Sequence, residues 1–221
     1  MENKIYKATS ICIDRLFNSG NIDKAALANL RNSKSLNDSY AIIVWPIIFE
    51  AINKAYKHAS KEEINQVLSQ NGAPTITETA IYTALCCYAI FQQGTDQKVY
   101  GSIREENESE RGQNLFSALR KISGLTSKMD DAIKTSLDRR VDMTLAMTNS
   151  TSIINSVVHL LRILKSKSNN VQVKIDFAQL ASDLFFMQLN RANARKISLK
   201  WGQDYYYWHD NDKKENKSKE K

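Results

Sequence analysis

The chain has very few of the residues that tight turns require, with 7 glycines and 2 prolines among 221 residues. Folds built from many short strands depend on glycine for positive backbone φ and on proline for turn geometry. A chain this poor in both is expected to form helices joined by short polar connections. Residues 152–165 agree, because Ile153, Val157 and Leu161 recur at helical spacing. We therefore predict an all-α, compact helical bundle in two halves, with about eight to nine helices.

Local signals mark where several helices begin and end. Ser60 with Glu63, and Thr75 with Glu78, have the spacing of a capping box. Asp176 is expected to cap the helix that follows it. A helix from about residue 113 to 122 is expected to be closed by a glycine at position 124.

The pattern along the chain predicts three parts. A soft boundary near residue 124 separates an N-terminal helical half, residues 1–124, from a C-terminal helical half, residues 125–208. Residues 209–221 have almost no apolar side chain and mix lysine with acidic residues, so we expect a disordered polar tail. Hydrophobic residues make up 42% of the chain, which is enough for a sizeable core in the rest.

The balance of charge is basic, with a formal net charge of +7 and a pI of about 9.2. A basic chain suggests a polyanionic partner, either nucleic acid or an anionic membrane surface. The longest apolar run, residues 41–49, is far too short to cross a bilayer, and residues 1–10 lack the apolar core of a secretory signal. The three cysteines have no spacing typical of a disulfide framework. We therefore expect a cytoplasmic protein.

Residue patterns that support catalysis are absent from the sequence. There is no phosphate-binding glycine loop, no dinucleotide fingerprint and no zinc-binding histidine pair. A cluster of four glutamates in residues 105–110 is a candidate metal site, but a solvated loop explains it better. Asp176 and Asp183 lie two turns apart on one helix and could serve acid–base or Mg²⁺ chemistry. We interpret them instead as an N-cap and as the partner of a nearby cation. We expect no enzyme activity, no catalytic residue, no cofactor and no metal.

The placement of basic residues is more informative than any of these motifs. They end one helix, open another and lie on or near the outer side of the helix over residues 152–165, where His159 shares a face with Arg162. Lys196 and Lys200 line the polar side of the last helix. Helices studded with cations can follow a phosphate backbone without reading bases. Arg139 also has a local explanation, since it can pair with Asp142 one turn further on.

Read in order, several segments resemble one family. They include Leu115-Phe116-Ser117-Ala118-Leu119-Arg120, Leu137-Asp138-Arg139-Arg140, Leu160-Leu161-Arg162-Ile163-Leu164 and Trp201-Gly202-Gln203-Asp204-Tyr205. Together they look like the CasB family, the small subunit of the type I-E CRISPR surveillance complex called Cascade. The resemblance covers about residues 5–208.

The resemblance implies an all-helical fold without catalytic activity, present as two copies side by side in the complex. It also implies contacts with the CRISPR RNA, with the target and displaced DNA strands, and with the large and backbone subunits. Carried over to this chain, the nucleic-acid-binding candidates are Arg31, Arg111, Arg120, Lys121, Arg139, Arg140 and Arg162. Three positions depart from the family pattern: Asn32, Val141 and Gln203.

The expected mechanism is electrostatic and blind to sequence. Neutralising about four phosphates of a single strand would give a slope near −3 when log affinity is plotted against log salt concentration. Two other hypotheses stay open at this point. One is a protein-interaction scaffold that is basic because it docks on an acidic neighbour. The other is a nuclease that uses Asp176 and Asp183.

Overall fold

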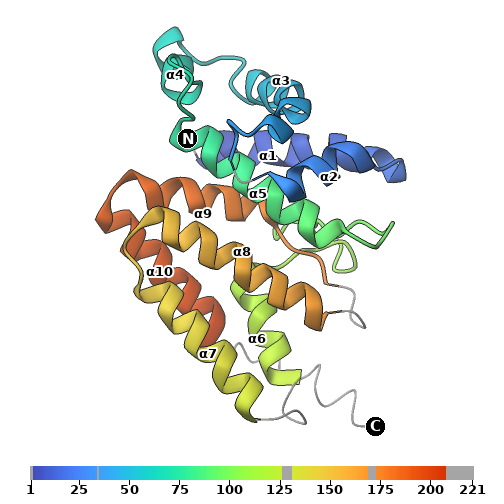
Figure 1. Cartoon of the computed structure of the whole chain (residues 1–221), viewed down its shortest axis with the longest axis vertical. Coiled ribbons are helices and arrows are strands. Elements are labelled where there is room, and N and C mark those ends of the chain that lie inside the picture. Colours follow the sequence, from blue (N-terminus) through green and yellow to red (C-terminus); the bar gives the residue numbers. More distant parts are fainter. Residues whose placement is uncertain (1, 34, 126–130, 169–172, 208–221) are drawn as a thin grey trace.

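The computed structural model describes residues 2–33, 35–125, 131–168 and 173–207 (Figure 1). Two short 3-10 helices, η1 (Asn18–Gly20) and η2 (Ser39–Val44), lie among its α-helices. The α-helices are α1 (Glu2–Phe17), α2 (Lys24–Asn32), α3 (Trp45–Ala55), α4 (Lys61–Val67), α5 (Ile76–Gln92), α6 (Leu115–Leu125), α7 (Asp131–Ala146), α8 (Ser150–Lys167), α9 (Phe177–Leu189) and α10 (Arg191–Tyr206). The predicted all-α class is confirmed. The described part has ten α-helices, slightly more than the eight to nine expected.

The two most apolar helices, α5 and α9, lie at the centre of the molecule. Buried residues number 13 of 17 in α5 and 10 of 13 in α9, which is the pattern of a helix with protein on most sides. They pack against each other, and α1 lies against both of them (Figure 1). The Phe177 ring meets Tyr88 edge-on, with centroids 5.7 Å apart, and lies 6.1 Å from Phe91. This aromatic cluster joins the start of α9 to the C-terminal half of α5.

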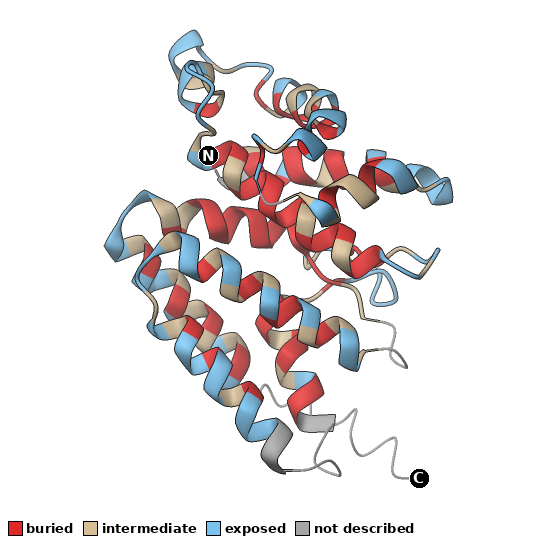
Figure 2. Ribbon diagram, in the orientation of Figure 1, coloured by how far each residue is buried: buried red, intermediate tan, exposed pale blue. Residues whose placement is uncertain are grey.

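In the C-terminal part, α6 and α7 pack against α10, and α8 packs on the other helices. Helix α10 contacts α6, α7 and α9, while α8 lies against α5, α6 and α7 (Figure 1). Phe116 of α6 stacks on Trp201 of α10 with centroids 4.7 Å apart, and both residues are buried. The outer faces of α8 and of α7 from residue 134 onward carry exposed residues (Figure 2). Those two helices therefore offer surface to a partner.

A short extended segment connects the loop before α6 to the start of α9. Ile175 forms isolated parallel bridges to both Tyr100 and Gln113. Gly101 and Gly112 bring the two sides of this loop into backbone contact, and a Cβ on either glycine would collide with the other chain segment. The loop is thus folded back on itself. The extended segment paired with it leads through Asp176 directly into α9.

The predicted helix boundaries are mostly correct. Thr75 and Glu78 form the expected capping box, and the Asp176 carboxylate accepts from Gln179 N at 2.8 Å. Ser60 caps α4, but Glu63 bonds Lys4 of α1 at 2.6 Å, so this capping box is only half formed. The prediction that residue 124 closes a helix is wrong, because α6 continues through it to its last residue, Leu125.

The polar tail expected over residues 209–221 lies outside the described residues. No helix in the described ranges is long and apolar enough to cross a membrane.

Candidate nucleic-acid interface

Asp183, one of the two acidic candidates for catalysis, is fully engaged in holding α9 to α10. Its carboxylate is 5% exposed and accepts hydrogen bonds from Trp201 Nε1 at 2.9 Å and from Gln179 Nε2 at 2.9 Å. Lys200 Nζ donates to both oxygens, at 2.7 and 3.0 Å. The prediction that a nearby cation pairs with Asp183 is confirmed, and Lys200 is that cation.

Asp176 is used in the same structural way. Beyond capping α9, its Oδ2 accepts from the Tyr6 hydroxyl and from Ile103 N, both at 2.9 Å. Burial raises the pKa of this carboxyl, while the three donors act in the opposite direction. The carboxylate ties α1, the 102–113 loop and α9 together, which accounts for its position without chemistry.

The other reactive groups are dispersed. Burial raises the pKa of the Cys12 thiol to about 12, so this thiol is inert near neutrality. Glu105, Glu106 and Glu108 are exposed, and Glu110 pairs with Lys174 at 2.6 Å. In the described part of the chain, no three His, Cys, Asp or Glu side chains come together as a metal site would require.

The exposed faces of α7 and α8 bring together several predicted cations. Arg140 Nη1 lies 2.7 Å from His159 Nε2, which joins the two helices at the surface. Arg139 is exposed beside it. The predicted ion pair between Arg139 and Asp142 is wrong: none joins them in the described structure, and Asp142 instead accepts from the Tyr206 hydroxyl of α10 at 2.6 Å. Arg139 is therefore left available at the surface.

Arg162 extends this surface along α8 toward α2. It stands one turn beyond His159 on α8, and both residues are exposed. It also lines a cavity of about 370 Å³ together with Arg31 from the end of α2 and Lys165 from α8. We give the name α8 strip to the basic residues of α7, α8 and the end of α2 in this region: Arg31, Arg139, Arg140, His159, Arg162 and Lys165.

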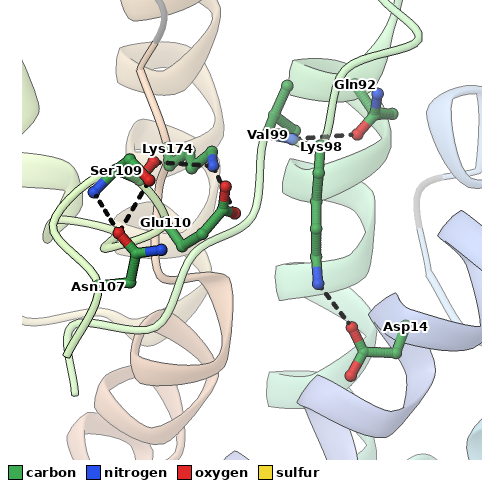
Figure 3. A network of polar contacts seen from close by, with 8 residues as sticks. All are labelled: Asp14, Gln92, Lys98, Val99, Asn107, Ser109, Glu110 and Lys174. Atoms are coloured by element: carbon green, nitrogen blue, oxygen red, sulfur yellow. Dashed lines mark hydrogen bonds and ion pairs between the residues drawn. The ribbon is translucent and has the colours of Figure 1, made fainter. Parts of the chain in front are cut away.

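Two further candidates form a separate group. Arg111 donates to the carbonyl oxygens of Glu105 at 2.7 Å and Glu106 at 3.4 Å, which fixes its side chain against its own loop. With Lys121 and Lys174 it lines a second cavity of about 400 Å³. Lys174 is neutralised there by Glu110 and also donates to Ser109 O at 3.0 Å (Figure 3). This group is basic, but it includes carboxylates that the α8 strip lacks.

Arg120 is separated from its neighbour Lys121 by the geometry of α6. It donates to the carbonyl oxygen of Tyr207, just beyond the end of α10. Lys121 faces the second cavity instead. Consecutive helix residues point about 100° apart, and here the two cations reach different parts of the molecule. Arg120 is used to hold the end of α10.

Lys165, which the sequence places with Arg162 on or near the outer side of the helix, makes a contact with α5 that was not predicted. Its ammonium donates to Phe91 O at 2.8 Å and lies 5.5 Å from the centre of the Phe91 ring. Burial lowers its pKa. This contact depends on how α5 packs against α8, which the spacing of residues within α8 does not indicate.

An exposed apolar surface on α7 and α10 was also missed. Leu199 is 65% exposed and Tyr207 62% exposed, and they line a groove of about 720 Å³ that also includes Leu145 and Tyr206. Lys200, expected on the polar side of α10, is turned to Asp183 instead. This part of α10 is thus more apolar than its sequence pattern indicates.

The fold and the site together define a class of protein: an all-α protein that carries a basic strip across three helices and uses its best-placed carboxylates as structural acceptors. The comparisons with known proteins then give the family. Residues 26–206 match the family model described as CRISPR-associated protein Cse2. The chain belongs to this family, also called CasB, which confirms the resemblance read from the sequence. It is thereby a subunit of the type I-E Cascade complex.

A solved structure agrees with the family in fold. The crystal structure of CasB from Thermobifida fusca has a TM-score of 0.62 to this chain, at 16% sequence identity, covering 93% of this chain and 98% of that one. No curated protein sequence matches the chain.

Proposed function

We propose that this chain is a non-catalytic small subunit of Cascade that binds the phosphate backbone of the guide RNA and target DNA and stabilises the R-loop. The observation that carries this proposal is the α8 strip, in which three helices contribute cations: Arg140 meets His159 between α7 and α8, and Arg31 of α2 lines one cavity with Arg162 and Lys165 of α8. Residues separated by more than a hundred positions in the sequence contribute to it, which a merely basic composition does not explain.

The mechanism that fits this strip is electrostatic. Guanidinium groups bind phosphate oxygens through forked N–H donors, and neutralising phosphates releases condensed counterions. The strip side chains Arg139 and Arg162 are exposed on helix faces, so they can meet a backbone without entering a groove. Sequence choice is left to pairing between guide and target, as in other RNA-guided systems.

The proposal includes the partners that this role requires. They are the CRISPR RNA, the target and displaced DNA strands, the large and backbone subunits of Cascade, and a second copy of this chain. The compartment is the cytoplasm, where these nucleic acids meet. The second basic group, around Arg111 and Lys121, is proposed as an additional phosphate contact.

Charge reversal tests the strip directly. We expect Arg139→Glu/Arg140→Glu and Arg162→Glu to weaken binding of single-stranded DNA, measured by fluorescence anisotropy at low salt. The matched control is Lys57→Glu/Lys61→Glu, since both lysines are exposed near α4, away from α7 and α8 (Figure 1). Circular dichroism checks that each variant stays helical. Equal affinities for all variants and the control would exclude the strip as the binding surface.

The apolar groove between α7 and α10 favours a second candidate function, a protein-interaction scaffold without nucleic-acid contact. Exposed large apolar side chains mark protein interfaces. A pull-down with the other Cascade subunits, after nuclease treatment and in high salt, separates the two proposals. Association that persists while single-stranded DNA binding is absent would favour the scaffold.

A further inference from the structure

The cavity where α2, α5 and α8 meet has an unusual set of charges. Its cations come from two helices: Arg31 from the last turn of α2, and Arg162 and Lys165 from α8. The rest of the lining is neutral, with Ile90, Gln93 and Ser166. None of the three cations is in an ion pair with a carboxylate of the described residues.

The end of α5 orients two of these cations. Arg31 Nη1 donates to Ala89 O at 3.4 Å, and Lys165 Nζ donates to Phe91 O at 2.8 Å. Both carbonyls belong to the last turn of α5, where helix carbonyls have no partner within the helix and the helix dipole is negative. These bonds hold the side chains in place but use few of their donors. A guanidinium has five N–H groups and an ammonium three.

Among the described residues, the lining of this cavity has three cations and no carboxylate. Partial burial reduces the hydration that stabilises such charges. Burial lowers the pKa of Lys165, so its charged ammonium is partly removed from water there. An anion seated among the three cations would supply the missing negative charge and accept the remaining N–H donors.

We propose that this cavity is a phosphate-binding pocket, in which Arg31, Arg162 and Lys165 together hold one phosphate group of a nucleic acid. A volume of about 370 Å³ is at the low end of the range for small-ligand sites, about 300–1,000 Å³. It suits a phosphate with part of its nucleotide. The inference rests on the proposed function and deepens it. It assigns one phosphate to a defined pocket and gives Lys165 a direct part in binding it.

Single and double substitutions test whether the two α8 cations hold the same group. We expect Arg162→Gln and Lys165→Met each to weaken binding of a single-stranded DNA oligonucleotide roughly tenfold, as for loss of a charged hydrogen bond. The control Lys167→Gln, on the same helix and exposed, should change it less than threefold. The double variant should lose less than the product of the single losses, because groups that share a ligand are not additive.

Lys165→Arg separates binding from folding, because Lys165 also caps α5 and Lys165→Met could loosen that helix. The arginine keeps the charge and should restore most of the affinity. An oligonucleotide with a 5′-phosphate, compared with its 5′-hydroxyl form, shows whether a terminal monoester or an internal diester is bound. Whichever oligonucleotide binds more tightly, Arg162→Gln must weaken its binding.

Two outcomes would overturn the pocket. In one, both single variants match Lys167→Gln while Arg139→Glu/Arg140→Glu still weakens binding, which leaves the proposed function intact. In the other, the single losses multiply in the double variant, which indicates independent diffuse contacts. If no strip variant weakened binding of single-stranded DNA, the proposed function itself would be excluded.

Discussion

Replacing Asp183 by alanine removes the carboxylate that joins α9 to α10, and its cost follows from the three donors left behind. Trp201 is 2% exposed and Gln179 5% exposed, so each loses an acceptor where water cannot replace it. A buried donor without a partner costs about 1–3 kcal/mol. The Lys200 side chain is 38% exposed and can be rehydrated, so its ion pair adds only about 0–1 kcal/mol. We therefore expect Asp183→Ala to lower the free energy of unfolding by about 2–7 kcal/mol, most of it from the two buried donors.

Urea unfolding followed by circular dichroism measures this loss. Asp183→Asn should cost less than the alanine variant, because its amide oxygen can still accept from Trp201. The matched control is Asp96→Ala, an exposed loop carboxylate, which should change stability by less than about 0.5 kcal/mol. An Asp183→Ala protein as stable as the control would refute the structural role. Mg²⁺-dependent DNA cleavage that disappears in this variant would revive the nuclease hypothesis.

Three further predictions follow from local contacts. Thr75→Ala removes the capping-box hydroxyl at the start of α5 and should cost about 1 kcal/mol of unfolding free energy in the same assay. Burial raises the pKa of Asp176, so the folded state holds this proton more tightly than the unfolded state. The stability of the wild type relative to Asp176→Asn should therefore fall as pH rises from the ordinary aspartate pKa through the raised one. A stability difference that rises over this range would contradict the prediction. Cys12 and Cys87 are fully buried, so Ellman's reagent at pH 8 should label at most one thiol, Cys86, before unfolding, whereas rapid labelling of all three would show that the core is open.

The fold class and the helix caps could be predicted from the sequence because they depend on local patterns. Spacing of apolar residues identifies an amphipathic helix, and Thr75 with Glu78 form their box within four residues. Asp176 as an N-cap is local in the same way. The end of α6 was mispredicted because one glycine lowers helix stability by only about 1 kcal/mol, which neighbouring residues can offset.

The arrangement of the cations depends on tertiary contacts that no local pattern contains. Arg31 and Arg162 meet at one cavity although they are far apart in the sequence. Arg120 and Lys121 are adjacent in the sequence, yet one binds the end of α10 and the other lines a separate cavity. The predicted bond of Arg139 failed for the same reason, since α10 brings Tyr206 to Asp142.

The salt dependence of single-stranded DNA binding tests the central proposal most directly. The α8 strip has five Lys and Arg side chains. With about four of them on phosphates, the wild type should give a slope near −3 in a plot of log affinity against log salt concentration. Arg139→Gln/Arg140→Gln should reduce that slope to about −1.5, since each lost contact removes about 0.7. A wild-type slope near zero, or one that the double variant leaves unchanged, would contradict a phosphate-binding strip on α7 and α8.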